Sequence, residues 1–214
     1  MFESFYNSFW QHPVLLWLSA IMGFLPYLAK SKRPLLTFGL GLTFLSLLDA
    51  WLTTTVIPGI GEPGKGLGLF FGVSFVILGD MRYFLFRSAA GSDGELHWSK
   101  KKIFSAFSLS LLVPLLSQVA GLIFPTSNSR VTFAVYEAMF ATLVIMQLML
   151  QAGNLWVRRV QWFVLAYYLL WLTSDLVILL TGSDFGFLLR VLANCMYYGG
   201  LTGFIALSVK PGAD

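Results

Sequence analysis

The chain has 214 residues, of which 57% are hydrophobic and only 11% are charged, and its net charge is +4. Soluble domains carry about 25% charged residues, so this composition excludes a water-soluble globule and indicates an all-α integral membrane protein. The mean hydropathy of +0.76 agrees with that class. The single cysteine, Cys195, excludes a disulfide bond within the chain.

Seven segments are apolar and long enough to be transmembrane helices, each of which needs about 20 residues. They follow residues 1–12, whose many aromatic side chains are typical of a membrane interface and which lack the basic region of a cleavable signal peptide. We expect residues 1–214 to form a single polytopic membrane domain, a seven-transmembrane helix bundle. The predicted spans are residues 13–29, 35–57, 67–86, 103–124, 131–151, 160–181 and 185–208.

Basic residues follow the odd-numbered spans, whereas the connections on the other side carry only Lys65 and Arg130. Because cytoplasmic loops are enriched in Lys and Arg, this pattern predicts an N-terminus outside and a C-terminus in the cytoplasm. We expect the bundle to lie in the plasma (inner) membrane. The residues of the predicted cytoplasmic side are Lys30, Lys32, Arg33, Arg87, Lys100, Lys101, Lys102, Arg158, Arg159 and Lys210.

Ionisable side chains inside spans are rare and mark candidate functional positions. Depth along each span, at about 1.5 Å per residue, places a set of polar groups in one slab of the outer half of the membrane. Asp80 lies deeper, near the midplane. Arg82 follows two residues later and is expected to extend toward the cytoplasmic headgroups. The slab contains Asp49, Glu137, Asp175, Arg190 and Asn194.

Helical spacing aligns these groups in stripes that face inward. Three carboxylates and one guanidinium would sum to about −2 if all were ionised, which a low-dielectric site resists. A protonated carboxylic acid, a bound cation or water in the site would remove or offset this excess negative charge. Asp175 and Arg190, which flank the short sixth connection, could instead be an ion pair that only locks two helices together. The stripes are Ser46, Asp49 and Thr53; Trp171 and Asp175; and Arg190, Asn194 and Tyr197 or Tyr198.

Other features have structural interpretations. His12 and His97 lie far apart, so we expect no zinc site and no cofactor; an oxygen-ligated cation is the weaker alternative. Gly199 and Gly203 form a pair of small residues one turn apart, which helix packing explains most simply and a homodimer explains second. The basic stretch 97–102 favours contact with anionic lipid, and we expect no nucleic acid partner.

Several spans resemble helices of a known family. The second and third, "GLTFLSLLDAWLTTTVIP" and "GVSFVILGDMRYFLF", resemble consecutive helices of the YhhN family of membrane lysoplasmalogenases. The fifth to seventh, "YEAMFATLVIM", "LLWLTSDLVILL" and "LANCMYYGGLTGFIAL", are similar to later helices of that family. The resemblance covers roughly residues 39–208. Gly79, Asp80 and Tyr83 occupy the places of a small residue, a histidine and a tyrosine, and Leu48 replaces a glycine, so two positions depart from the family pattern.

The resemblance implies a lipid hydrolase that cleaves the vinyl ether bond of a lysoplasmalogen into a fatty aldehyde and a glycerophospho-headgroup. Protonation of the β-carbon of the vinyl ether creates an oxocarbenium ion. A second carboxylate then stabilises that ion or activates water. Our hypothesis assigns Asp49 and Asp175 as acid and base, with Asp80 near them, and assigns Arg190 to the lipid phosphate. The expected substrate-binding residues are Glu137, Arg190, Asn194, Tyr197, Trp171 and Tyr83.

Two other classes of function use the same residues. A small proton- or cation-coupled transporter would use the acids as a relay. A ligand-binding or accessory membrane subunit would use them to hold a ligand. The expected partner is a membrane lipid or a lysolipid.

Overall fold

The computed structural model describes residues 1–30, 33–52, 67–91, 93–123, 128–150 and 154–209, without the side chains of residues 67–76, 118, 120–123 and 129. In these residues the regular secondary structure is helical, apart from one antiparallel bridge between Ala90 and Leu96. The predicted all-α class is therefore confirmed. The ends of three predicted spans, at residues 53–57, 124 and 151, lie outside the described residues, as do Lys32, Lys65 and Lys210.

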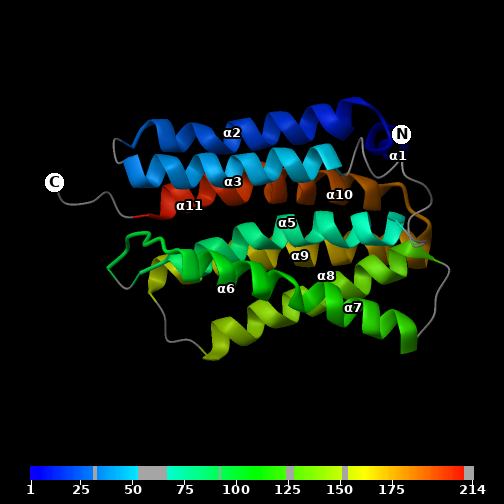
Figure 1. Cartoon of the computed structure of the whole chain (residues 1–214). Coiled ribbons are helices and arrows are strands. Elements are labelled where there is room, and N and C mark those ends of the chain that lie inside the picture. Colours follow the sequence, from blue (N-terminus) through cyan, green and yellow to red (C-terminus); the bar gives the residue numbers. More distant parts are fainter. Residues whose placement is uncertain (31–32, 53–66, 92, 124–127, 151–153, 210–214) are drawn as a thin grey trace.

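A short helix, α1 (Phe2–Tyr6), precedes seven helical rods in the described part of the chain, and successive rods run antiparallel (Figure 1). Each rod coincides with one predicted span, because the connections carry the turn and charged residues that end a helix. In chain order the rods are η1 (Trp10–Leu15) with α2 (Leu16–Leu28), α3 (Arg33–Trp51), α5 (Leu67–Ala89), α6 (Lys100–Ser110) with α7 (Leu112–Ile123), α8 (Ser129–Leu150), α9 (Leu155–Thr181), and α10 (Phe185–Cys195) with η3 (Met196–Gly200) and α11 (Leu201–Ser208).

Four of the described helical stretches are long and apolar enough to cross a membrane, which supports a membrane protein. The outer surface of the bundle agrees, because large apolar side chains such as Phe104, Met149 and Leu180 are exposed on it. The count of seven crossings stays a prediction. The four stretches are Arg33–Trp51, Arg130–Leu150, Leu155–Thr181 and Phe185–Ser208.

Three rods are interrupted. The first contains η1, in which His12 has a non-helical φ of −119° and ψ of 109°. The fourth breaks at Leu111 because Pro114 has no N–H to donate to the carbonyl of Ser110. The seventh contains η3, a wide π-helical turn that joins α10 to α11. Such turns often occur where a helix takes part in a site, because they leave backbone carbonyls free to accept other hydrogen bonds.

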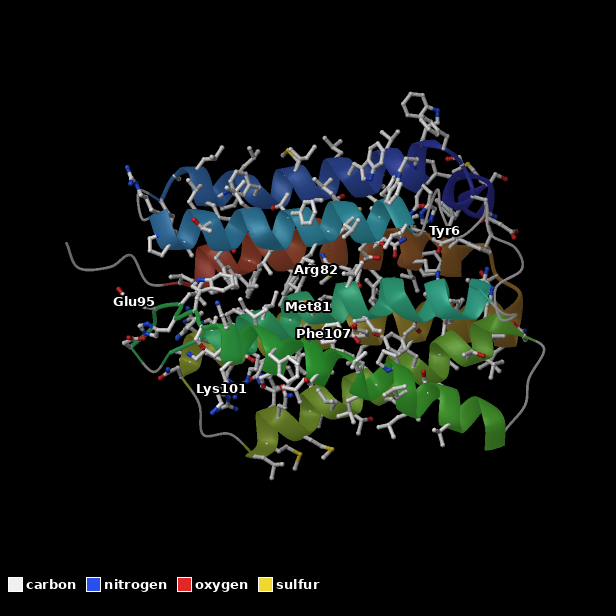
Figure 2. All side chains as sticks on the ribbon, in the orientation of Figure 1. Tyr6, Met81, Arg82, Glu95, Lys101 and Phe107 are labelled. Atoms are coloured by element: carbon white, nitrogen blue, oxygen red, sulfur yellow. The ribbon has the colours of Figure 1, made fainter. Side chains whose placement is uncertain are left out.

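The basic residues gather at one end of the bundle. We call the end with α1 and the α9–α10 turn the N-terminal end, and the end where α11 stops the C-terminal end (Figure 1). Figure 2 shows Tyr6 near the N-terminal end, Arg82 midway along the bundle, and Lys101 and Glu95 near the C-terminal end. The described basic residues at the C-terminal end are Lys30, Arg33, Arg87, Lys100, Lys101, Lys102, Arg158 and Arg159.

Helix α2 crosses the seventh rod at a contact between glycines. A Cβ at Gly23 would overlap the carbonyl of Gly199, and a Cβ at Gly199 would overlap the carbonyl of Ser19. A Cβ at Gly203 would lie 3.4 Å from the carbonyl oxygen of Gly23. The interpretation of Gly199 and Gly203 as a packing pair is therefore confirmed within one chain, and the homodimer stays a prediction.

The last two rods form a tight antiparallel hairpin, as the short sixth connection between them indicates. Helix α9 ends at Gly182, whose φ of +62° is in the left-handed region that favours glycine. Helix α10 begins at Phe185, and Gly186 approaches α9 so closely that its carbonyl accepts a hydrogen bond of 2.7 Å from the Ser174 hydroxyl. This short turn brings Asp175 and Arg190 face to face, because they lie at similar distances from it along the two helices.

Candidate functional site

The polar groups inside the bundle form two clusters. The central cluster lies midway along the bundle and is carried mainly by α3, α5, α8, α9 and η3. The ionic cluster lies nearer the N-terminal end and is carried by α8, α9, α10 and α1. The central cluster comprises Ser46, Asp49, Gly79, Asp80, Arg82, Tyr136, Tyr168 and Tyr197, and the ionic cluster comprises Tyr6, Arg130, Glu137, Asp175 and Arg190.

Arg82, which Figure 2 labels midway along the bundle, is the centre of the central cluster, and its side chain has no exposed surface. Its guanidinium donates to the Ser46 hydroxyl at 2.5 Å and to the carbonyl of Tyr197 at 2.9 Å, and it lies 3.6 Å from the Asp49 carboxylate. The guanidinium carbon is 4.1 Å from the centre of the Tyr197 ring. The expectation that Arg82 extends to the cytoplasmic headgroups is wrong, because a carboxylate, a hydroxyl and a carbonyl of the wide turn η3 hold it inside.

Asp80, two residues before Arg82, faces α8 and α9. One carboxylate oxygen accepts hydrogen bonds from Tyr168 at 2.6 Å and from Tyr136 at 2.7 Å, and the two hydroxyls are 3.2 Å apart. Because α5 is surrounded by other helices, residues on opposite faces of it are both buried. Helix α5 therefore carries a carboxyl group on one face and a guanidinium on the other, and neither is exposed at the surface.

Gly79 lets Tyr197 reach the centre. A Cβ at Gly79 would overlap the Tyr197 hydroxyl and would lie 3.1 Å from the Asp49 carboxylate. The hydroxyl of Tyr197 and the carboxylate of Asp49 therefore meet at the backbone of α5. This contact places Asp49 in the central cluster, on a level with Asp80 and Arg82.

The ionic cluster joins Asp175 to two guanidiniums. Arg190 donates a short hydrogen bond to the Asp175 carboxylate, Arg130 donates to the same oxygen at 3.3 Å, and Glu137 lies 4.0 Å from Arg190. Asp175 has no exposed surface and Glu137 is buried. The predicted grouping of Asp175, Glu137 and Arg190 is therefore present, whereas Asp49 belongs to the other cluster, beside Arg82.

Two members of the ionic cluster were missed by the sequence reasoning. From the sequence, Arg130 is expected in a connection between spans, although it lies seven residues before Glu137 and thus on the same face of one helix, a spacing that could have indicated it. Tyr6 was placed at the membrane interface, but its hydroxyl accepts a hydrogen bond of 3.0 Å from Nε of Arg190. No local pattern in residues 1–12 indicates that contact.

Residues between the clusters link them along two helices. Trp171, one turn from Asp175, donates from its indole nitrogen to the amide oxygen of Asn194 at 2.9 Å. Trp171 also packs against the rings of Tyr168 and Tyr197, at 5.6 and 4.7 Å between centroids. The predicted stripes on α9 and α10 therefore face each other and lead from the ionic cluster to the central one.

Tyr83 lies on the far side of the central cluster, toward the C-terminal end. Its hydroxyl hydrogen-bonds the side chain of Gln147, whose amide oxygen is 3.5 Å from the Gln161 amide nitrogen. The ring packs against Phe140 at 5.8 Å. Tyr83 is therefore part of the polar interior but is placed one turn beyond the carboxylates.

The charges of the two clusters nearly balance. Four carboxylates, on Asp49, Asp80, Glu137 and Asp175, accompany three guanidiniums, on Arg82, Arg130 and Arg190, so that full ionisation would leave about one negative charge. The excess expected from the sequence was larger, because Arg82 and Arg130 were assigned to the surface. Buried charges that are paired and hydrogen-bonded are the arrangement a low-dielectric interior tolerates.

A third group of polar side chains lies in the hairpin between α5 and α6. Asp93, Glu95 and His97 bring ligand atoms within 4.8 Å of one another, and Asp93 is 2.6 Å from Nε2 of His97. The Glu95 amide and the His97 ring hold the pKa of the Asp93 carboxyl below its usual range. All three side chains are exposed and two already pair with each other, so we assign no ion to them.

No family model, no curated protein and no solved structure matches the chain.

Proposed function

We propose that the chain crosses the plasma (inner) membrane seven times, with its N-terminus outside and its C-terminus in the cytoplasm. The gathering of basic residues at the C-terminal end of the bundle supports this orientation. The test is the reaction of single cysteines with an impermeant thiol reagent in intact cells, in a Cys195→Ser background. Ser183→Cys should react from outside and Asp93→Cys only after lysis; the reverse result would overturn the orientation.

We further propose that the protein is a membrane-embedded lipid hydrolase, similar to lysoplasmalogenases, that cleaves the vinyl ether bond of a lysolipid. One observation carries this proposal: the buried carboxylates of Asp49 and Asp80 flank Arg82 in a centre walled by tyrosines. Two carboxylates in different environments are what acid–base chemistry at neutral pH requires. Neither carboxylate lies on the surface, so neither is there to make the protein soluble.

In the reaction a carboxylic acid protonates the vinyl β-carbon and an oxocarbenium ion forms. A carboxylate removes a proton from water, which adds to the cation, and the hemiacetal then breaks down to the aldehyde and the free hydroxyl of the headgroup. The geometry favours Asp49 and Asp80 as this pair, and it favours a substrate-binding role for Asp175 rather than the acid–base role inferred from sequence. The faces of the Tyr197 and Trp171 rings would stabilise the cation.

The ionic cluster supplies the polar end of the substrate site in this proposal. Arg190 and Arg130 have the planar donors that match a phosphate, and Arg130 has 28% of its side-chain surface exposed at the N-terminal end. Asn194 and Trp171 line the path toward the central cluster. The headgroup would lie at Arg190 and Arg130, and the vinyl ether would lie deeper, at Asp49 and Asp80.

The experiment is turnover of a lysoplasmalogen by purified protein, followed as aldehyde release. We expect Asp49→Asn and Asp80→Asn to lower the rate by about a hundredfold or more, because each removes a proton-transfer group. Asp93→Asn, at the exposed hairpin, is the matched control and should leave the rate unchanged. Absence of turnover by the unmodified protein, or unchanged rates for both core variants, would reject the hydrolase.

A proton-coupled transporter is the second candidate, favoured by the succession of polar groups along the bundle. These groups extend from Arg130 through Trp171 and Asn194 to Asp80, and on to Tyr83 and Gln147. Buried ionisable groups in series are typical of proton relays. Proton uptake by liposomes that contain the protein, lost in Asp80→Asn and retained in Asp93→Asn, would select this function instead.

A further inference from the structure

Helix α1 covers the ionic cluster through a few polar contacts. The carboxylate of Asp184, in the α9–α10 turn, accepts hydrogen bonds from the backbone amides of Phe2 at 2.8 Å and Glu3 at 2.6 Å, and from the amino group of Met1 at 2.9 Å. The ring of Tyr6 packs on Phe187 with centroids 5.6 Å apart. One carboxylate and one ring therefore hold the helix against α10.

The hold on α1 is weak in comparison with the rest of the bundle. None of the residues Phe2–Tyr6 is buried, and the contacts to Asp184 are exposed or partly buried. Segments with few buried apolar contacts open locally at low free energy, without unfolding of the core. Opening of α1 would leave α10 intact, because Asp184 makes no side-chain hydrogen bond to its own helix.

Tyr6 occupies a hydrogen-bond donor of Arg190 that an anionic ligand would need. Its hydroxyl accepts the Nε hydrogen of Arg190 at 3.0 Å, and that guanidinium also bonds Asp175 and lies 5.8 Å from the centre of the Tyr6 ring. Because Nη1 of Arg190 already bonds Asp175, an anionic ligand that bonds this guanidinium in a planar, two-pronged manner must use Nε and Nη2. With α1 closed, Nε is occupied and only 13% of the Arg190 side-chain surface is exposed.

We propose that α1 is a lid over the ionic cluster and that Tyr6 competes with an anionic headgroup for Arg190, so that a ligand binds only when α1 opens. The identity of that ligand as a lysolipid headgroup rests on the proposed function, whereas the opening itself does not. A ligand that binds one state of a two-state element has its apparent affinity lowered by the population of the closed state. Variants that favour the open state should therefore bind more tightly.

The first test measures opening without any substrate. Phe187 is 5% exposed beneath the Tyr6 ring, so Phe187→Cys in a Cys195→Ser background reports whether α1 is closed. We expect an impermeant maleimide to label this cysteine about tenfold faster when Asp184→Ala is added, because that variant loses the three hydrogen bonds that hold α1 against α10. Asp93→Ala, an exposed acid at the opposite end, is the control and should leave the labelling rate unchanged.

The second test uses the chain with Phe187 unaltered. The probe is a lysophospholipid with a saturated alkyl ether, which has the headgroup but no vinyl bond to cleave. Tyr6→Phe should lower the apparent Kd by several-fold, since it removes the competing acceptor and keeps the ring. A higher or unchanged Kd for Tyr6→Phe, or an unchanged labelling rate for Asp184→Ala in a folded protein, would overturn the lid. A protein without hydrolase activity whose labelling still responds to Asp184→Ala would instead reject only the proposed reaction.

Discussion

The hydroxyl of Tyr197 lies against the backbone of Gly79, where η3 passes α5. A methyl group at position 79 would overlap that hydroxyl, so neither partner can grow without displacing the other. We expect Gly79→Ala to destabilise the bundle by about 1–3 kcal/mol, the usual cost of overpacking a buried contact. Thermal unfolding in detergent, compared with the unmodified protein, measures this loss.

A second variant, Tyr197→Phe, distinguishes a steric clash at Gly79 from a general effect of alanine on α5. Tyr197→Phe removes the hydroxyl, which is the atom nearest to the new methyl group, and leaves only the overlap with the ring carbon Cζ. Gly79→Ala combined with Tyr197→Phe should therefore be more stable than Gly79→Ala alone, with a coupling of about 1 kcal/mol between the two sites. Strict additivity of the two changes would show that the contact does not control the stability of this region.

Arg82 is expected to be essential for the fold as well as for the site. Arg82→Met leaves the fully buried Asp49 carboxylate without its guanidinium and should cost about 3–5 kcal/mol. Combining Arg82→Met with Asp49→Asn removes both charges and should recover part of that loss. If the double variant were less stable than Arg82→Met, the ion pair at 3.6 Å would not be the source of the effect.

The two guanidiniums on Asp175 should differ in importance. Arg190→Gln removes the side chain that Asp175 and Glu137 share, and leaves two buried carboxylates, so we expect a loss of about 3–5 kcal/mol. Arg130 is partly exposed and makes a longer contact, so Arg130→Gln should cost about 1 kcal/mol or less. Melting temperatures of the two variants give the comparison, and equal losses would contradict the assigned roles.

The helical rods and the inward stripes could be predicted because they depend on local pattern. Apolar segments of about 20 residues separated by turns define rods in any membrane protein, and spacing of three or four residues defines a face. Asp175 and Arg190 could be paired because a short turn leaves only one way for α9 and α10 to meet.

The partners of Arg82 and Asp49 could not be predicted because they depend on the position of α5 among the other rods. A helix at the edge of the bundle would let Arg82 extend to the cytoplasmic headgroups, as expected from the sequence. Burial of α5 on all sides turned it toward Asp49 and the carbonyls of η3. Likewise, the contact of Tyr6 with Arg190 joins residues 184 positions apart, and no local pattern encodes it.

The contacts of Asp184 with α1 should weaken as the pH falls. Hydrogen bonds from the Met1 amino group and from the amides of Glu3 and Phe2 lower the pKa of Asp184 from 3.8 to about 2. Since α1 docks on the ionised carboxyl of Asp184, these hydrogen bonds are at full strength above about pH 4 and are lost as the pH falls through about 2. A spin label at Phe5→Cys, in the Cys195→Ser background, should become mobile over that interval.

Asp184→Asn is the control for the pH experiment, because it cannot ionise. A label on α1 of that variant should be mobile at every pH, and its spectrum should not change between about pH 4 and about pH 2. An equal transition in both proteins would assign the change to other groups, such as the carboxylates of the bundle.

Two glycines in neighbouring helices should respond to alanine with opposite signs. A Cβ at Gly23 would overlap the carbonyl of Gly199, whereas a Cβ at Gly41, on the exposed side of α3, meets nothing within 4 Å. Gly41→Ala should therefore stabilise the protein by about 0.5–1 kcal/mol, because alanine loses less backbone freedom in a helix. Gly23→Ala should lower the melting temperature, because α2 must move away from η3. Similar shifts for both variants would mean that helix propensity, and not the close crossing of α2, determines the effect.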